Sequence, residues 1–530
     1  MVKKFKKISA FILSALMCAA MSATAFADEP YEAYSYDFFD ESMPAQNGYI
    51  VDRVITGADM GLGQLSDPNS SLFISVDESA SLYEAKDMFV TDDGDIFIVD
   101  AGKQQIPGSA RIIVLGSDFK VKKVIKEFTG GNTFDANGNE IINLNDPSGI
   151  YVDDKNGNKY TMYICDYNNS RVVMCDQDGN IKREYKMPDS EVYTFQTFNP
   201  KKVVVDGAKN VYVVAQSVNT GAIMFNEEGK FLSFYGANRV EVTAAVRVQR
   251  VWRKLFFSDK QRTASTRTTP VEYANFDIDK DGFIYTVTEA ANASTDAVKK
   301  LNPAGNNIWN NNAGNEYVFG DKEASVWYGN KTYSTRLTDV CVADDGTINI
   351  LDYSSGKIFQ YDKEANLMFI FGTKSTEQAG GFTAPNAIEV LNDDILIIDG
   401  SKNDITVFRK TLFGEYVHQA VDLHNQGLYE EAVGPWQEVI KRDGNFAMAY
   451  TGIGRALLNQ GNYKEAMEYF ENSYNQEDYD RAYEGYRQDF LRKNFTAIII
   501  IIVALVVVIA VFRFLIKHGI LRLPTKNTRL

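Results

Sequence analysis

The stretch KDMFVTDDGDIFIVD, residues 86–100, decides the fold because its pattern recurs six times along the chain. Each copy has an apolar run, a turn rich in Asp, Asn and Gly, and a second apolar run that ends at or near an Asp, as expected of an antiparallel hairpin. The other copies are SGIYVDDKNGNKYTMYICD (148–166), KVVVDGAKNVYVV (202–214), NFDIDKDGFIYTV (275–287), DVCVADDGTINILD (339–352) and AIEVLNDDILIID (387–399). One such unit cannot bury both faces of its sheet, so the repeats predict a mainly β architecture, a six-bladed β-propeller over residues 45–410.

The sixth unit lacks a fourth strand in sequence order. After residues 405–409 the chain turns helical, whereas YIVDRVIT, residues 49–56, precedes the first unit and belongs to no blade. We predict that residues 49–56 form the outer strand of the sixth blade. This pairing would close the ring and remove an exposed sheet edge.

The turn chemistry of the second unit resembles that of the NHL-repeat family of six-bladed propellers. In this unit DPSG (146–149) enters the inner strand, DYNNSR (166–171) forms the second turn and DQDG (176–179) forms the third. The other units match more loosely. The resemblance implies the propeller fold but no single function, because propellers host binding proteins, scaffolds and enzymes.

Residues 415–490 contain a second kind of repeat. NQGLYEEAVGPW (425–436) matches NQGNYKEAMEYF (459–470) at a spacing of 34 residues. This period, with its G-x-Y-x-x-A pattern, is a tetratricopeptide (TPR) signature and predicts a short α-helical segment. The candidate partner-binding side chains of this segment are its repeated aromatic residues, Tyr429, Trp436, Tyr463 and Phe470.

Two apolar segments predict how the protein is placed in the cell. Residues 1–27 have a basic start, an apolar stretch and Ala25-Phe26-Ala27, which is typical of a signal peptide. Residues 495–516 would span about 33 Å as one transmembrane helix. A short basic tail, residues 517–530, follows and is expected in the cytoplasm. The sequence thus predicts a single-pass cell-membrane protein with its N-terminal domain outside the cell.

Charge and histidine content exclude several functions. The net charge is −15, and the basic residues at the two ends leave the middle still more acidic, which argues against a nucleic-acid partner. The three histidines, at positions 418, 424 and 518, all lie outside the six repeats. A histidine zinc site and a Ser–His triad are therefore excluded there. Cys165, Cys175 and Cys341 fall in apolar strands and are interpreted as small buried side chains without a disulfide.

A basic insertion separates the third and fourth units, whose equivalent residues Val205 and Ile278 are 73 residues apart. Residues 237–269 carry eight Lys and Arg residues against two acidic ones. One interpretation is a solvated loop that packs through Trp252. The other is a docking element for an acidic or membrane-embedded partner. Its candidate residues are Arg250, Trp252, Arg253 and Lys254.

Polar residues near the starts of the inner strands mark the central channel as the candidate ligand site. They are Asp87, Ser148, Lys202, Asn275, Asp339 and Asn386. Oxygen ligands of this kind suit calcium, as in the lactonase-like propellers, but Lys202 would oppose a cation and structural roles are the alternative. No other cofactor is indicated.

Two function classes follow. The first is a surface-anchored, non-enzymatic binding or scaffold protein that recognises a protein, a peptide or a glycan and accompanies a membrane protein such as a transporter. The alternative is a calcium-dependent, lactonase-like hydrolase that uses the central channel. Two interaction modules on one membrane stem favour the first class.

Overall fold

The computed structural model describes residues 29–62, 81–154 except 104 and 107, 159–236, 272–288, 297–309, 319–322, 326–328, 331–333 and 335–518. The chain divides into two compact units, residues 1–414 and 415–530. The predicted signal peptide, the basic insertion and most of the predicted cytoplasmic tail lie outside the described residues.

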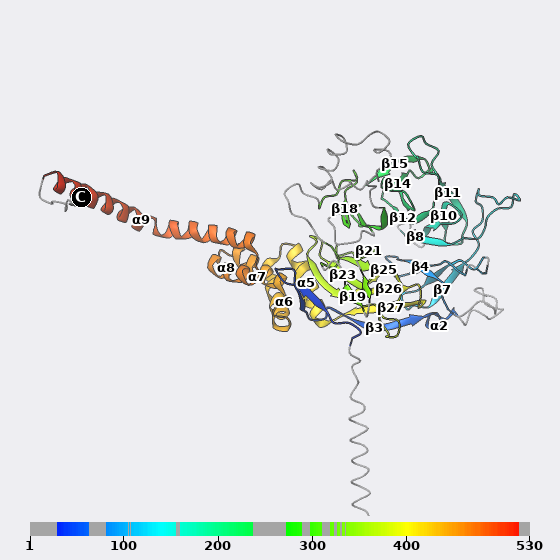
Figure 1. Cartoon of the computed structure of the whole chain (residues 1–530), viewed down its shortest axis with the longest axis horizontal. Helices are drawn as coiled ribbons and strands as arrows, with labels where there is room; N and C mark the ends of the chain where they lie inside the picture. The colour runs from blue at the N-terminus through cyan, green and yellow to red at the C-terminus, as the bar shows by residue number, and fades with distance from the viewer. Residues whose placement is uncertain are drawn as a thin grey trace, which may run out of the picture. The chain divides into compact units, whose positions relative to one another are not determined.

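The first unit is the predicted six-bladed β-propeller, and this fold class is confirmed (Figure 1). Blade one contains β4 (Ala85–Val90), β5 (Ile96–Asp100), β6 (Arg111–Leu115) and β7 (Val121–Ile125); blade two contains β8 (Pro147–Asp153), β9 (Thr161–Asp166), β10 (Arg171–Asp176) and β11 (Ile181–Lys186). Blade three contains β12 (Pro200–Val205), β13 (Val211–Ala215), β14 (Ala222–Phe225) and β15 (Phe231–Tyr235); blade four, in its described part, contains β16 (Tyr273–Ile278), β17 (Ile284–Thr288) and β18 (Val298–Leu301).

Blades five and six complete the ring. Blade five contains β21 (Leu337–Val342), β22 (Ile348–Asp352), β23 (Lys357–Tyr361) and β24 (Leu367–Phe371); blade six contains β25 (Pro385–Leu391), β26 (Asp394–Asp399), β27 (Asp404–Lys410) and β3 (Tyr49–Thr56). β3 pairs with β27 in antiparallel register, with Ile55 opposite Ile405 and Val54 opposite Thr406. The strand that the sequence leaves without a blade therefore closes the sixth one.

A short helix and four short strands lie outside the blades in the described part of the propeller unit. The strands β1 (Tyr34–Tyr36) and β2 (Ser42–Pro44) form a hairpin before β3, the helix α2 (Gly57–Met60) follows β3, and β19 (Val326–Tyr328) pairs with β20 (Lys331–Tyr333). The hairpin is tied to blade five because the Tyr34 hydroxyl donates to Asp321 Oδ2 at 2.9 Å and Lys357 Nζ donates to the same oxygen at 2.8 Å.

The recurring Asp at the end of the second strand has a structural role. Asp100, Asp166, Asp352 and Asp399 are fully buried or nearly so. Each carboxylate accepts a hydrogen bond from the backbone N–H of the segment that enters its blade, for example from Asn145 to Asp166 at 2.8 Å and from Arg336 to Asp352 at 2.9 Å. These bonds fix where each inner strand begins, because a buried carboxylate must find its donors locally.

The core of the propeller lies between neighbouring blades. Apolar side chains of successive sheets face one another, such as Ile98 of blade one and Leu396 of blade six. Cys165, Cys175 and Cys341 are free and buried, as interpreted from the sequence. The six inner strands β4, β8, β12, β16, β21 and β25 surround the centre of the ring and carry the candidate site residues.

The second unit is helical. It contains most of α5 (Leu412–Asn425), followed by α6 (Tyr429–Arg442), α7 (Ala447–Asn459), α8 (Tyr463–Asn472) and α9 (Gln476–Lys517). α9 runs without a break from the helical segment into the apolar stretch (Figure 1). Among the described residues it is the helix with the length and composition of a membrane span, and its most apolar window has a mean hydropathy of 3.5 with no buried residue.

Candidate functional site at the centre of the propeller

The register of the inner strands divides the six candidate channel residues into two sets. Asp87, Lys202, Asn275 and Asp339 each lie immediately after a β-bulge and pair with the second strand of their own blade. They therefore form one layer. Ser148 and Asn386 lie one position earlier in their strands, and the layer positions of blades two and six are occupied by Gly149 and Ala387.

A buried ion pair crosses this layer. Lys202 Nζ of blade three donates to both carboxylate oxygens of Asp87 in blade one, at 2.7 and 2.9 Å. Because blade two separates these blades around the ring, the pair spans the centre. Asp87 Oδ2 also accepts a hydrogen bond from the Ile150 N–H at 2.8 Å. Both side chains are at least 90% buried.

The electrostatics of the pair follow from its burial. Burial raises the pKa of Asp87, and the Lys202 ammonium partly opposes that effect. Burial alone would lower the pKa of Lys202, but the charges of Asp87 and Asp339 outweigh it and hold the Lys202 pKa above its usual value. Lys202 therefore stays a charged ammonium, which leaves no base at this position for proton abstraction near neutral pH.

Asp339 is the second buried carboxyl of the layer. Its Oδ1 accepts from Asn275 Nδ2 at 2.5 Å and from the Val340 N–H at 2.9 Å, and its Oδ2 accepts from the Ile388 N–H at 2.8 Å. Burial raises the pKa of Asp339 to about 7, against the lowering effect of Lys202. Its bonds reach Asn275 in blade four and Ile388 in blade six, so this carboxyl joins three blades.

Ser148 and Asn386 join blades rather than form a ligand shell. The Ser148 hydroxyl donates to the carbonyl oxygen of Pro200 in blade three at 2.8 Å. The Asn386 amide donates to the carbonyl oxygen of Ala85 in blade one at 2.9 Å. Both residues are thus engaged with the neighbouring inner strand.

The donor set of this layer does not fit calcium. A calcium ion requires six to eight oxygen ligands, whereas Asp87 is neutralised by Lys202 and both oxygens of Asp339 accept hydrogen bonds. No group of three or more His, Cys, Asp or Glu side chains within the described part of the chain is placed to hold a metal ion.

A cavity of about 380 Å³ lies at one end of the channel, beside the turns between first and second strands. Its wall includes Phe89, Tyr151, Asp277, Cys341 and Glu389, which sequence reasoning did not select. Each lies two residues after a layer position in its own strand. Since side chains alternate along a strand, counting two residues onward from the candidates Asp87, Asn275 and Asp339 would have found Phe89, Asp277 and Cys341. Tyr151 and Glu389 follow Gly149 and Ala387, which are not polar and were not candidates.

The polar groups of this cavity are partly buried and acidic. The Asp277 carboxylate accepts hydrogen bonds from the N–H groups of Val342 and Ile278, both at 2.8 Å, and burial raises its pKa to about 6. The Cys341 thiol donates to Glu389 Oε2 at 3.4 Å. Burial raises the pKa of Glu389 well above its usual value, and that of the Cys341 thiol likewise. The cavity suits a ligand with hydrogen-bond donors better than an anion.

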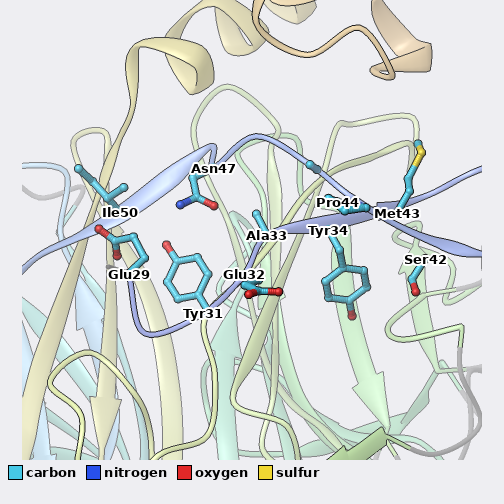
Figure 2. Close-up of a pocket in the computed structure, with 11 residues that line it drawn as sticks. Glu29, Tyr31, Glu32, Ala33, Tyr34, Ser42, Met43, Pro44, Asn47 and Ile50 are labelled. Atoms are coloured by element: carbon cyan, nitrogen blue, oxygen red, sulfur yellow. The ribbon is translucent and has the colours of Figure 1, made fainter. Parts of the chain in front are cut away.

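A second depression, of about 890 Å³, runs along the N-terminal segment between Glu29 and Ile50 (Figure 2). The Tyr31 hydroxyl donates to the Tyr49 carbonyl oxygen at 2.6 Å, and Glu29 Oε2 accepts from the Val51 N–H at 3.1 Å. These bonds fasten the segment to the closing strand β3. The sequence offered no motif for this depression, because it is built from one non-repetitive segment.

The structure corrects part of the predicted partner surface of the helical segment. Trp436 and Phe470 are almost fully buried. Trp436 packs against Gly452, where an added Cβ would lie 2.2 Å from the Trp436 ring. Phe470 packs against Gly454, where an added Cβ would lie 2.5 Å from the Phe470 ring. These two rings form the interior of the helical unit because the glycines let the helices approach, so they are removed from the candidate partner surface.

Tyr429 and Tyr463 are half-buried. Tyr429 lies edge-on to His424 at 4.8 Å, and Tyr463 packs against Gly485 of α9. Both keep some exposed surface. The remaining candidates, Arg250, Trp252, Arg253 and Lys254, lie outside the described residues.

The fold defines the class of this protein as a six-bladed β-propeller with C-terminal helices. No protein-family model matches the sequence, and no curated protein matches it. Solved structures match at low similarity. A catalytically inactive virginiamycin B lyase from Staphylococcus aureus, with quinupristin, is 12% identical, with 62% of this chain and 96% of that chain covered and a TM-score of 0.37.

Two further matches come from Bacteroides thetaiotaomicron. A protein of unknown function is 12% identical, with 70% of this chain and 78% of that chain covered and a TM-score of 0.38. The extracellular domain of a putative hybrid two-component system is 9% identical, with coverages of 64% and 39% and a TM-score of 0.34. Such low identities and TM-scores carry no conclusion about the ligand or the activity of this chain.

Proposed function

We propose that this protein is a membrane-anchored binding or scaffold protein whose propeller faces the outside of the cell. In this proposal residues 1–27 are a signal peptide, α9 is the single membrane span and residues after it are cytoplasmic. The propeller is of the NHL type and the helices α5 to α8 are TPR-like. The partner is a protein of the membrane or envelope, such as a transporter that this protein accompanies.

The observation that carries this proposal is the Lys202–Asp87 ion pair. An ammonium held between the inner strands by two contacts of 2.7 and 2.9 Å neutralises the carboxylate that a channel-based metal hydrolase would need. The polar groups of the layer bond to one another and to neighbouring backbones. They support a structural role for the layer, which leaves recognition to the surfaces and to the cavity at the channel end.

The cavity and the helical unit support two kinds of recognition. The cavity of about 380 Å³ has aromatic walls at Phe89 and Tyr151 and carboxyl groups at Asp277 and Glu389. It would accept a side chain of a peptide or a sugar ring of a glycan through apolar contact and hydrogen bonds. The helical unit would bind the protein partner through exposed surfaces of its helices.

The test is purification of the full-length protein from its native membrane in mild detergent, followed by mass spectrometry of co-purifying proteins. We expect a stoichiometric membrane partner. Deletion of residues 425–470 should release this partner if the helical unit binds it, and deletion of residues 237–269 should release it if the insertion does. A protein that purifies alone in every preparation would contradict the scaffold proposal.

The alternative function is a calcium-dependent, lactonase-like hydrolase. Its support is the presence of carboxyl groups at Asp277 and Glu389 in the channel-end cavity. A thermal melt with and without calcium separates the two functions. We expect no change in melting temperature with millimolar calcium. A rise that the Asp277→Asn variant abolishes would favour the hydrolase.

A further inference from the structure

The cavity at the channel end has a wall of two kinds. Phe89 of blade one and Tyr151 of blade two form its aromatic part, and their rings meet edge-on with centroids 5.2 Å apart. Asp277 of blade four and Glu389 of blade six bring carboxyl groups to the wall. In a ring of six blades the fourth lies opposite the first, so a carboxyl group stands across the cavity from an aromatic ring.

The hydroxyl group of Tyr151 has no partner among the described residues. Only 9% of the Tyr151 surface is exposed, and the side chain lines the cavity. The buried tyrosines of neighbouring blades differ in this respect, since Tyr235 donates to the Asn302 carbonyl oxygen at 2.6 Å and Tyr285 to Asp279 at 3.1 Å. A buried polar group is normally hydrogen-bonded, so the Tyr151 hydroxyl marks a position where a ligand atom would complete its bonding.

The two carboxyl groups also keep unused acceptor sites. Glu389 Oε2 accepts from the Cys341 thiol at 3.4 Å, and no described residue donates to its other carboxyl oxygen. Each oxygen of Asp277 accepts one backbone N–H, from Ile278 and from Val342. Since a carboxylate oxygen has about two acceptor sites, both side chains have room for further donors. The wall thus offers acceptors and lacks donors.

The charge around the cavity favours a cation. Among the described residues that line it, Lys280 is the one basic side chain, and its ammonium pairs with Asp344 at 2.8 Å. The Lys202 ammonium in the layer beneath is bonded to both oxygens of Asp87. Such a concentration of one sign of charge in a concave site attracts the opposite charge. The other carboxyl groups of the wall belong to Asp92, Asp154, Asp279 and Asp281.

A metal ion does not account for this cavity. No three His, Cys, Asp or Glu side chains in the described part of the chain converge to hold one. Blade five separates the blades that carry Asp277 and Glu389, so the two carboxyl groups are spread around the wall. The volume of about 380 Å³ also suits a larger group with several N–H donors. Aromatic rings such as Phe89 attract organic cations through their faces and pack against apolar stems.

We propose that this cavity binds an organic cation, an ammonium or guanidinium group on an apolar stem. The N–H groups of the cation donate to Asp277 and Glu389, and one of them supplies the hydrogen bond that the Tyr151 hydroxyl lacks. The stem packs against the Phe89 and Tyr151 rings. Lysine and arginine side chains and free amines share this chemistry. This inference rests on the proposed recognition role of the cavity and names the class of its ligand.

The test is isothermal titration calorimetry of the full-length protein in mild detergent. The cationic probes are N-acetyl-lysine methylamide and N-acetyl-arginine methylamide. N-acetyl-norleucine methylamide is the matched neutral probe, because it keeps an apolar stem and the backbone but has no charge. We expect at least one cationic probe to bind at least tenfold more tightly than the neutral one.

Butylammonium distinguishes the two sources of the cation, since it is the lysine side chain without the backbone. Binding within tenfold of the lysine amide would indicate a free amine as the natural ligand. Binding weaker than that would indicate a side chain of a peptide. Either result is consistent with the cation site.

Substitutions in the wall show whether the cation binds there. Glu389→Gln removes a charge but keeps an acceptor for the Cys341 thiol, and it should weaken the cationic probe at least tenfold without affecting the neutral one. Tyr151→Phe keeps the ring and should weaken the cationic probe several-fold. Its melting temperature without ligand should stay unchanged, because the hydroxyl has no partner among the described residues.

Asp93→Asn is the matched control for long-range charge. Asp93 is exposed in the same turn as the wall residue Asp92 but does not line the cavity. Its substitution should change the affinity less than twofold. Three results would overturn the proposal: no binding of either cationic probe, equal binding of the lysine and norleucine amides, or equal effects of Glu389→Gln and Asp93→Asn.

The co-purification experiment tests the scaffold function separately. A membrane partner that co-purifies with a protein unable to bind the cationic probes would refute the cation site and leave the scaffold function intact. A protein that binds the cationic probes but always purifies alone would retain the cation site and contradict the scaffold function.

Discussion

Gly149 of blade two lies so close to Lys201 of blade three that a Cβ atom at position 149 would be 2.3 Å from the Lys201 carbonyl oxygen. The same two strands are joined by the Ser148 hydroxyl, which donates to the Pro200 carbonyl oxygen. This close approach places β12 where Lys202 can reach Asp87 across the ring. The glycine that ends the DPSG motif thus lets the inner strands of blades two and three approach closely.

Substitution of this glycine should therefore weaken the propeller. We expect Gly149→Ala to lower the free energy of unfolding by about 1–3 kcal/mol, because the added methyl group meets backbone atoms that cannot move independently. Gly207→Ala is the matched control, since a Cβ there would have no atom within 4 Å. Urea unfolding of the detergent-solubilised full-length protein measures both. Equal effects of the two changes would contradict the close packing.

Substitution of Lys202 alone should lower the free energy of unfolding more than substitution of Lys202 and Asp87 together. Lys202→Met leaves the Asp87 carboxylate buried without its cation and should cost about 3–5 kcal/mol of unfolding free energy. The double variant Lys202→Met, Asp87→Asn removes the charge and keeps an acceptor for the Ile150 N–H, so part of the loss should return. Urea unfolding of the unsubstituted protein, Lys202→Met, Asp87→Asn and the double variant gives the coupling energy. Additive effects would show that the two side chains do not interact.

The closing strand should be essential for the stability of the whole ring. Tyr49 of β3 is buried, stacks on Phe371 at 4.8 Å and accepts a hydrogen bond from Gln360 Nε2 at 3.0 Å. Tyr49→Ala should cost about 3–5 kcal/mol, and Tyr49→Phe about 1 kcal/mol. Deletion of residues 49–56 should lower the melting temperature further. An unchanged melting temperature after the deletion would refute the role of this strand.

Asp277 should make stability depend on pH. Its folded-state pKa of about 6 exceeds its ordinary value of 3.8, so the folded protein binds this proton more tightly than the unfolded chain does. Stability from this group is therefore highest at low pH and falls as pH rises from about 4 to about 6, by roughly 3 kcal/mol in all.

The Asp277→Asn variant tests this dependence. We expect the difference in unfolding free energy between pH 4 and pH 7 to change by about 3 kcal/mol, because the amide does not titrate. Hydrogen bonds that the amide fails to make would lower stability equally at both pH values. An unaltered profile in Asp277→Asn would show that this carboxyl is not perturbed by burial.

The candidate site was predictable only in part. The sequence located Asp87, Lys202, Asn275 and Asp339 near the channel, and they share one layer. It misplaced Ser148 and Asn386 by one position, because the layer positions of blades two and six hold Gly149 and Ala387, and the polar residue beside each was taken instead. It also missed Asp277 and Glu389, whose importance depends on the cavity beside them.

The sequence by itself determined the number of blades, the strand that closes the ring and the position of the apolar helix. Alternation along a strand, turn residues and helix length are local properties, and local chemistry sets them. Only the tertiary structure decided that Lys202 reaches Asp87 and that Trp436 is interior. Such contacts join residues from different blades or helices, and they depend on how closely small residues such as Gly149 and Gly452 let the backbones approach.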